Sequence, residues 1–374
     1  MKKHTNAKRR LVALLGLVGV ALSATAQAAI QFAPMVNYPT GSAGGPGPAA
    51  EAMVQVDLDN DGDADIVMAD WWGTGIRAML NNGSGGFGPA IVTNLLTSTG
   101  SVGAGDFDGD GKADIAVATG MQLIILRGNG DGTFTELSRR TLVVSGQVQA
   151  YVFDTNNDGR LDIVAPTPGG VKTFLGQGNG DFVDGPTSPV YTVISSTARG
   201  NFNNDGIADI AIIDDVAQRA IIMRGNGDGS FTEMATAFLG FIAEDIAAGD
   251  LNGDGIDDLA SADSFSFSMS VVLSNGVGSY QPTKRYFGIG GPVGIRMADF
   301  DGDGDPDIVV SAVVTSKLAV YTNNGSGTLS GPQNLSVTNQ PQTPVVADYN
   351  RDGEPDIAVA GAGGQLSVLR NTSP

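Results

Sequence analysis

The sequence predicts an all-β fold, a seven-bladed β-propeller of four-stranded antiparallel blades. Three observations support this prediction. An Asp- and Gly-rich loop recurs seven times at intervals of 47 to 49 residues. Each interval holds four short apolar runs separated by turn residues, and the 54 glycines accompany no long segment of helical period. A fixed period of this length indicates one supersecondary unit per repeat, and four strands form one propeller blade.

The first 28 residues are predicted to be a cleaved signal peptide, which leaves residues 29–374 as a single propeller domain. Five basic residues precede an apolar run, and an A-x-A cleavage site ends at Ala28. A membrane anchor is the alternative, but the run is short and rich in small residues near its end. The pair Arg9 and Arg10 weakly indicates twin-arginine export. We therefore expect a bacterial-type export signal and a secreted or periplasmic protein, without a membrane span after residue 28.

Charge and composition exclude several classes of function. The net charge is −19, and it becomes −24 without residues 1–28, which carry five of the 21 basic residues and none of the 40 acidic ones. This charge argues against nucleic acid and anionic membranes as partners. There is no cysteine, and His4 is the only histidine. The mature chain therefore has no disulfide, no thiolate or imidazole zinc site, and no Cys-His or Ser-His-Asp catalytic centre.

The recurring loop has the composition of a calcium site. In "DLDNDGDADI", from Asp57, positions 1, 3, 5 and 9 are carboxylates, and position 6 is a glycine that permits a sharp turn. Hard oxygen ligands of this kind suit Ca²⁺ better than Mg²⁺. The predicted metal ligands of the seven loops are Asp57, Asp59, Asp61 and Asp65; Asp106, Asp108, Asp110 and Asp114; Asp154, Asn156, Asp158 and Asp162; Asn201, Asn203, Asp205 and Asp209; Asp250, Asn252, Asp254 and Asp258; Asp299, Asp301, Asp303 and Asp307; and Asp348, Asn350, Asp352 and Asp356.

An EF-hand and a metal-free turn are the two alternatives to this calcium loop. An EF-hand needs a bidentate Glu at position 12 and helical flanks, whereas here the acid falls at position 9 and the flanks are strand-like. An Asp/Asn-Gly turn needs no metal, and this explanation suits one copy better than seven. We expect up to seven structural Ca²⁺ ions, with loop 4 the weakest because Asn201 and Asn203 replace two carboxylates.

Ring closure is also predicted from the sequence. The seventh unit stops before its fourth strand, and the N-terminal "IQFAPMVNYPT" supplies the missing piece. A strand from this segment would complete the last blade and remove two exposed sheet edges. An open solenoid is the alternative, but it would need capping units. The residue that follows each Gly-rich turn is large and apolar, in the order Phe87, Phe134, Phe182, Phe231, Tyr280, Leu329 and finally Phe32.

Candidate ligand-binding residues lie at the rim away from the acidic loops. This rim carries the turns between second and third strands and the connections between blades, where sequence varies most. Its aromatic side chains would bind a sugar ring or a protein partner. The alternative is packing between blades, which we favour for the phenylalanines and leave open for the tryptophan pair. The candidates are Trp71, Trp72, Phe265, Phe267 and Tyr286, with Phe241 and Phe287 on the same rim.

The loop D-x-[DN]-x-[DN]-G-x-x-D-[IL] and the GDGTF-like turns resemble the FG-GAP/VCBS repeat family, which includes the propeller of integrin α subunits. The resemblance covers the chain from about Ile30 to its end. It implies a seven-bladed propeller with calcium loops between first and second strands. The "FG" and "GAP" elements are blurred, and loop 4 begins with Asn201.

The expected function is a non-catalytic, calcium-binding module for adhesion or for binding a carbohydrate or an extracellular surface protein. A non-enzymatic role fits a chain made of repeats with no histidine or cysteine after residue 28. The alternative is a calcium-dependent polysaccharide lyase or hydrolase that would use Asp, Arg, Lys or Tyr as acid or base.

Overall fold

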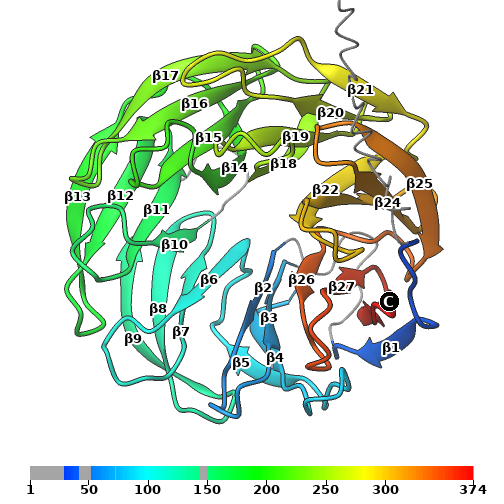
Figure 1. Cartoon of the computed structure of the whole chain (residues 1–374). Coiled ribbons are helices and arrows are strands. Elements are labelled where there is room, and N and C mark those ends of the chain that lie inside the picture. The colour runs from blue at the N-terminus through cyan, green and yellow to red at the C-terminus, as the bar shows by residue number, and fades with distance from the viewer. Residues whose placement is uncertain (1–28, 42–51, 72, 143–149, 374) are drawn as a thin grey trace, which may run out of the picture.

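The computed structural model describes residues 29–41, 52–71, 73–142 and 150–373, and the predicted signal peptide lies outside these ranges. Seven four-stranded antiparallel sheets stand around a central axis, with the first strand of each blade innermost (Figure 1). Blades 1 to 4 consist of β2 (Met53–Val56), β3 (Asp65–Asp70), β4 (Gly75–Met79) and β5 (Ile91–Asn94); β6 (Ser101–Gly105), β7 (Asp114–Ala118), β8 (Gln122–Gly128) and β9 (Phe134–Thr141); β10 (Tyr151–Phe153), β11 (Asp162–Thr167), β12 (Gly170–Gly176) and β13 (Phe182–Ser188); and β14 (Ile194–Gly200), β15 (Asp209–Asp214), β16 (Arg219–Gly225) and β17 (Phe231–Phe238).

Blades 5 to 7 follow the same order, and the last one takes its outer strand from the N-terminal end of the chain. They consist of β18 (Ala243–Gly249), β19 (Asp258–Asp263), β20 (Ser268–Val272) and β21 (Lys284–Phe287); β22 (Pro292–Ala298), β23 (Asp307–Ala312), β24 (Lys317–Asn323) and β25 (Leu329–Ser336); and β26 (Val345–Ala347), β27 (Asp356–Gly361), β28 (Gln365–Leu369) and β1 (Val36–Pro39). None of the described segments forms a helix long and apolar enough to cross a membrane.

The hydrophobic core lies between the blades rather than on the axis. Seven clusters of buried side chains occur in the described part of the chain, and each joins two adjacent blades. The second strand of each blade is buried along most or all of its length because both faces of the sheet are covered. This explains why these strands are continuous apolar runs instead of alternating ones.

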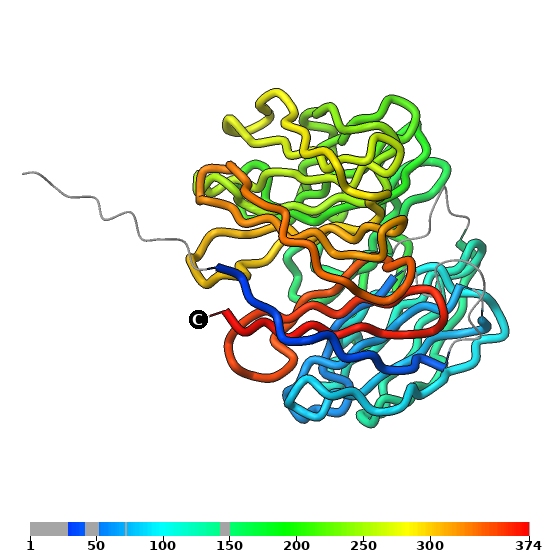
Figure 2. The backbone as a smooth tube through the Cα atoms, turned by 90° about the vertical axis from the view of Figure 1, so that its right-hand side faces the viewer, coloured from blue at the N-terminus to red at the C-terminus, as the bar shows by residue number. Residues whose placement is uncertain are grey.

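Strand β1 closes the ring, as the sequence predicts. It pairs antiparallel with β28, from Val36 opposite Val368 to Pro39 opposite Gln365. Figures 1 and 2 show the blue strand beside the red strands of the C-terminal end. The ring of Phe32 contacts the ring of Phe300 in blade 6 edge to face, with centroids 6.0 Å apart. Phe32 thus occupies in blade 7 the place that Phe182 takes in blade 3, where it contacts Phe107 of blade 2.

Candidate functional site

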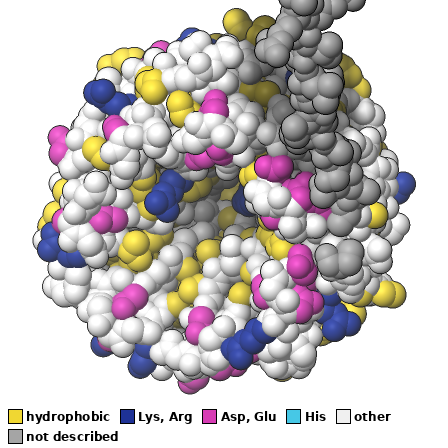
Figure 3. All heavy atoms as spheres, viewed as in Figure 1, with side chains coloured by type: hydrophobic (Ala, Val, Ile, Leu, Met, Phe, Trp, Pro, Cys, Tyr) yellow, Lys and Arg dark blue, Asp and Glu magenta, His cyan; other side chains and the backbone are white. Residues whose placement is uncertain are grey.

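The acidic loops connect the first and second strands of each blade, so all seven lie on one rim, named here the acidic rim. Their register is constant: the last residue of the first strand pairs with the position-9 aspartate, as Val56 pairs with Asp65 and Ala298 with Asp307. Eight loop residues therefore separate each pair. Acidic side chains are spread at intervals around the ring in Figure 3.

The position-9 aspartate has a structural role in every blade. Asp65 has no exposed surface, and its two carboxylate oxygens accept hydrogen bonds from the backbone N–H groups of Leu58, at 2.8 Å, and Asn81, at 2.7 Å. The carboxylate therefore fastens the start of the loop to the end of the third strand. The same two bonds recur at Asp114, Asp162, Asp209, Asp258, Asp307 and Asp356.

Burial raises the pKa of several of these position-9 carboxyl groups. Loss of solvation raises the pKa of Asp65 to about 6 and that of Asp307 to about 7, although the two backbone donors oppose the change. Asp258 and Asp356 are raised to about 7 and about 6 for the same reason. Neighbouring loop carboxylates raise the pKa of all four further. A cation at the loop would relieve this repulsion.

Carboxylates converge in three loops. Asp57, Asp59 and Asp61 each place an oxygen within 4.8 Å of the others, as do the trios Asp106, Asp108, Asp114 and Asp299, Asp301, Asp303. These are loops 1, 2 and 6, which carry four aspartates each. Acidic clusters in this part of the structure have the donor set of a site for a hard metal ion.

Unpaired buried oxygens support the fit to a cation. Asp301 is 3% exposed, and neither of its carboxylate oxygens accepts a hydrogen bond from the described residues. The Oδ1 atom of Asp57 is likewise buried without a partner. A buried carboxylate without a donor is costly, so these oxygens are suited to metal coordination.

In three of the four loops with asparagine at position 3, an amide N–H donor lies beside the position-5 carboxylate. In loops 3, 4 and 7 the amide Nδ2 of the position-3 asparagine donates to the position-5 carboxylate, as from Asn156 to Asp158 at 3.0 Å and from Asn203 to Asp205 at 2.9 Å. An N–H donor thus stands beside the carboxylate that a cation would otherwise balance. In loop 4 the backbone N–H of Asn201 also donates to Asp257 of blade 5, at 2.7 Å.

Arginines contact three of the acidic loops, and in loop 3 Arg160 pairs with Asp158 at 2.6 Å. Arg127 of β8 reaches Asp108 and Asp110 of loop 2, each at 2.9 Å. Arg351 of loop 7 pairs with Asp63 of loop 1 and donates from Nη2 to the carbonyl oxygen of Asp61 at 2.6 Å. Both contacts of Arg351 join blade 7 to blade 1.

Sequence reasoning also missed position 4 of the loop. This residue has a positive φ in every copy, from 57° at Asn157 to 76° at Gly109. Asparagine and glycine tolerate this left-handed conformation, which explains why position 4 is Asn or Gly in six loops. Arg351 is the exception, with φ of 61°.

The opposite rim, where second strands turn into third strands and blades connect, exposes many apolar side chains. It carries most of the exposed large apolar side chains among the described residues. They are Trp71, Leu96, Met121, Tyr191, Val193, Val216, Phe238, Phe241, Ile242, Phe265, Phe267, Phe287 and Val314. The chain therefore has one acidic rim and one rim with exposed apolar groups.

Four phenylalanines gather on this rim at blade 5, and we name them the blade-5 aromatic surface: Phe241, Phe265, Phe267 and Phe287. The rings of Phe241 and Phe265 lie 5.9 Å apart, and both side chains are more than half exposed. The carbonyl oxygen of Phe267 accepts from the backbone N–H of Gly288, next to Phe287. All four phenylalanines are more than half exposed, which contradicts the interblade packing that the sequence favours for them.

The other candidate aromatic residues lie elsewhere. Tyr286 packs between blades 5 and 6, where its ring contacts Tyr321 at 5.7 Å and its hydroxyl accepts from the backbone N–H of Leu329. Trp71 is 39% exposed and belongs to blade 1. Trp72 lies outside the described residues. Phe265 and Phe267 therefore share the turn between β19 and β20, whereas Tyr286 packs between two blades and Trp71 lies in blade 1.

Seven blades and seven acidic first-turn loops define a repeat β-propeller with candidate metal sites. A family model described as FG-GAP-like repeat matches residues 57–117, 106–165, 201–261, 250–310 and 299–359. The chain belongs to this FG-GAP-like repeat family. No curated protein matches the sequence.

Solved structures share the fold at low sequence identity. An Agrocybe aegerita lectin, described for specific recognition of non-reducing terminal N-acetylglucosamine, is 20% identical with a TM-score of 0.54, covering 77% of this chain and 81% of the lectin. BBS1N, solved in complex with ARL6DN, is 12% identical with a TM-score of 0.63, covering 92% of this chain and 97% of BBS1N. At these identities the likeness concerns the fold alone.

Proposed function

We propose that this protein is an exported, calcium-binding, non-catalytic module that binds carbohydrate through the blade-5 aromatic surface. The observation that carries the proposal is the pair Phe241 and Phe265, whose rings lie 5.9 Å apart while 52% and 67% of these residues remain exposed. Exposed apolar side chains that lie next to one another often mark an interaction site, whereas isolated ones are common on protein surfaces. Sugar rings have apolar faces that stack on such side chains.

Polar groups beside the rings favour a carbohydrate over a purely apolar partner. Ser264 donates from its hydroxyl to the carboxylate of Glu244 at 2.9 Å, and Ser266 accepts from the backbone N–H of Phe241 at 3.2 Å. Hydroxyls and a carboxylate next to aromatic rings supply both kinds of contact that a sugar makes. The fold likeness to a lectin is compatible with this function.

Calcium has a structural part in the proposal. The acidic loops lie on the rim opposite the blade-5 aromatic surface, so bound ions would stabilise the blades without contacting the sugar. Binding of Ca²⁺ to the folded chain alone adds to the free energy of unfolding. Loops 1, 2 and 6, where carboxylates converge, are the proposed strongest sites.

A glycan array probed with residues 29–374, in calcium and in chelator, tests the proposal. We expect selective glycan binding in calcium, weakened about tenfold or more by Phe265→Ser or Phe241→Ser, which corresponds to about 1.4 kcal/mol. Val216→Ser is the matched control, because Val216 is 76% exposed in the equivalent turn of blade 4.

Three results would overturn parts of the proposal. Absence of glycan binding by a protein with an intact β-sheet circular dichroism spectrum would favour a protein partner. Equal loss in Val216→Ser would remove the blade-5 aromatic surface from the site. Release of reducing or unsaturated ends from a bound polysaccharide would replace a binding module with the lyase or hydrolase alternative.

A further inference from the structure

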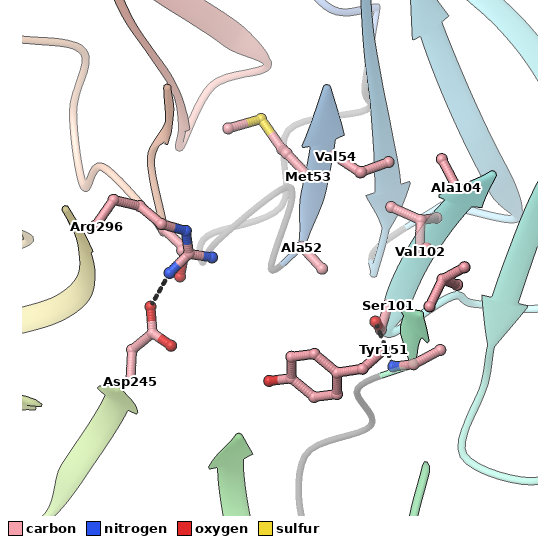
Figure 4. Close-up of a pocket in the computed structure, with 13 residues that line it drawn as sticks. Ala52, Met53, Val54, Ser101, Val102, Ala104, Tyr151, Asp245 and Arg296 are labelled. Atoms are coloured by element: carbon pink, nitrogen blue, oxygen red, sulfur yellow. Dashed lines mark hydrogen bonds and ion pairs between the residues drawn. The ribbon is translucent and has the colours of Figure 1, made fainter. Parts of the chain in front are cut away.

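The centre of the ring contains a cavity that the proposed function does not use. It has a volume of about 230 Å³ and lies among the inner strands of blades 1, 2, 3, 5 and 6. Figure 3 shows the ring hollowed at its centre, and Figure 4 shows the residues around this cavity. We infer that it binds a small organic carboxylate with an apolar body, held by the guanidinium of Arg296. This inference is independent of carbohydrate binding at blade 5.

Arg296 presents a fixed set of donors to the cavity. Its Nη1 atom donates to Oδ2 of Asp245 at 2.8 Å and to the carbonyl oxygen of Ile295 at 2.6 Å. Among the described residues these are the hydrogen bonds of the guanidinium, so Nε and Nη2 have no protein acceptor there. Figure 4 shows a guanidinium nitrogen that points away from Asp245 into the cavity. The side chain is 36% exposed, which leaves this edge accessible.

Asp245 orients Arg296 and is itself held rigidly. Its Oδ1 atom accepts from the Ser196 hydroxyl at 2.9 Å and from the backbone N–H of Ile246 at 3.0 Å, and its Oδ2 atom accepts from the backbone N–H of Ile295 at 3.1 Å. A β-bulge precedes Asp245 in β18, and bulges redirect side chains. Because both oxygens are occupied, Asp245 serves to position the guanidinium.

Tyr151 forms another wall without adding charge. Its hydroxyl accepts from the backbone N–H of Thr197 at 3.0 Å, which ties blade 3 to blade 4. Burial raises the pKa of Tyr151, so the phenol stays neutral and does not repel an anion. Ser101 lies beside it and accepts from the backbone N–H of Ala150 at 3.0 Å. Figure 4 shows Tyr151 extending towards the Asp245–Arg296 pair.

The other side chains that line the cavity favour a ligand whose uncharged part is apolar. Ala52, Val54, Val102, Ala104 and Val152 line the cavity with small apolar side chains. The volume of about 230 Å³ is large enough for a six-membered ring that carries a carboxylate.

A singly charged carboxylate fits the electrostatics better than a dianion. Among the residues that line the cavity, Arg296 is the one basic side chain and Asp245 the one acidic side chain, so the two charges of the lining balance. A guanidinium edge offers two parallel N–H groups whose spacing matches the two oxygens of a carboxylate. Phosphate would bring a second negative charge for which the lining supplies no second cation.

Titration of the full chain with benzoate and with its neutral isostere benzamide tests the inference. We expect saturable benzoate binding by ligand-observed NMR in the millimolar range, at least tenfold tighter than benzamide. Arg296→Met should remove this preference. Arg219→Met is the matched control, because the Arg219–Asp214 pair has the same 36% exposure of the arginine but lies outside the residues that line the cavity.

A second variant keeps the test decisive if Arg296→Met does not fold. Ala52→Leu fills the cavity while leaving the Asp245–Arg296 pair intact, and it should weaken benzoate binding tenfold or more. Equal affinities for benzoate and benzamide, unchanged binding in Ala52→Leu, an equal loss in Arg219→Met, or no saturable benzoate binding would each overturn the inference.

Discussion

The guanidinium of Arg127 contacts the carboxylate of Asp108, with Nε and Oδ2 2.9 Å apart. Its Nη2 atom also lies 2.9 Å from Oδ2 of Asp110. These carboxylates occupy positions 3 and 5 of loop 2, where the proposed calcium ion would bind. Arg127 therefore supplies positive charge at a place that a metal ion would otherwise fill, and the two should compete.

Replacement of Arg127 by glutamine should raise the calcium affinity of loop 2 several-fold, because the ion no longer displaces a guanidinium. Calorimetric titration of the metal-free protein measures this change. Arg224→Gln is the control, since Arg224 occupies the same position in blade 4 and makes no ion pair with its loop in the described structure. Weaker binding in Arg127→Gln would show that the arginine supports the metal site.

Asp301→Asn should have opposite effects with and without metal. Both oxygens of Asp301 are buried and unpartnered, and burial together with Asp303 raises its pKa. A neutral amide removes that uncompensated charge, so we expect a free energy of unfolding about 1–3 kcal/mol higher in chelator. In calcium the variant should lose one of the tight sites. Urea unfolding under both conditions measures the two effects, and destabilisation in chelator would contradict the prediction.

Asp307→Asn provides the contrast within the same loop. Asp307 accepts backbone hydrogen bonds from Phe300 at 2.9 Å and Asn323 at 2.8 Å, and an amide NH₂ cannot replace the second acceptor. One buried N–H then has no partner, which costs about 1–3 kcal/mol. We expect this loss in chelator as well as in calcium. Destabilisation only in calcium would mean that Asp307 acts mainly as a metal ligand.

The fold could be predicted because the sequence motif that specifies each blade repeats at a constant spacing. Seven copies of one loop at constant spacing indicate the number of blades, and Phe32 indicates that the N-terminal segment completes the last one. The position-9 aspartate was harder to interpret, because its sequence pattern is the same whether it binds a metal or two backbone amides. Only the register of the hairpin shows that Asp65 faces Leu58 and Asn81.

Non-repeating contacts could not be predicted in this way. Arg351 contacts Asp61 and Asp63 across the closure of the ring, at a separation of 290 residues for the first of these. Tyr151, Asp245 and Arg296 come from three different blades and meet only because the ring is closed. The sequence places Phe265 in a turn but does not show how much of the residue its neighbours cover, and in the structure 67% of it is exposed.

Metal-free protein should become less stable as the pH rises towards neutrality. Burial raises the pKa of Asp258 and Asp307 from 3.8 to about 7, so the folded state binds protons more tightly than the unfolded chain. Their stabilising contribution is complete below about pH 4 and is lost as the pH passes about 7. Bound calcium favours the ionised carboxylates and should reduce this dependence.

Urea unfolding in chelator at about pH 5.5 and about pH 7.5 measures the effect, with parallel series in calcium. A higher free energy of unfolding in chelator at the higher pH would contradict the prediction. An identical dependence in calcium would show that the ion does not reach these carboxyls.

Side-chain packing where the ring closes should contribute strongly to the free energy of unfolding. Phe300 is fully buried, and its ring contacts Phe32 from the opposite end of the chain. Phe300→Ala would leave a cavity between blades 6 and 7 and should lower the free energy of unfolding by about 3–5 kcal/mol. Phe265→Ala, at a residue that is 67% exposed, should change it by no more than about 0.5 kcal/mol. Chemical denaturation in calcium compares the two variants, and similar losses would mean that Phe265 packs against other residues in solution.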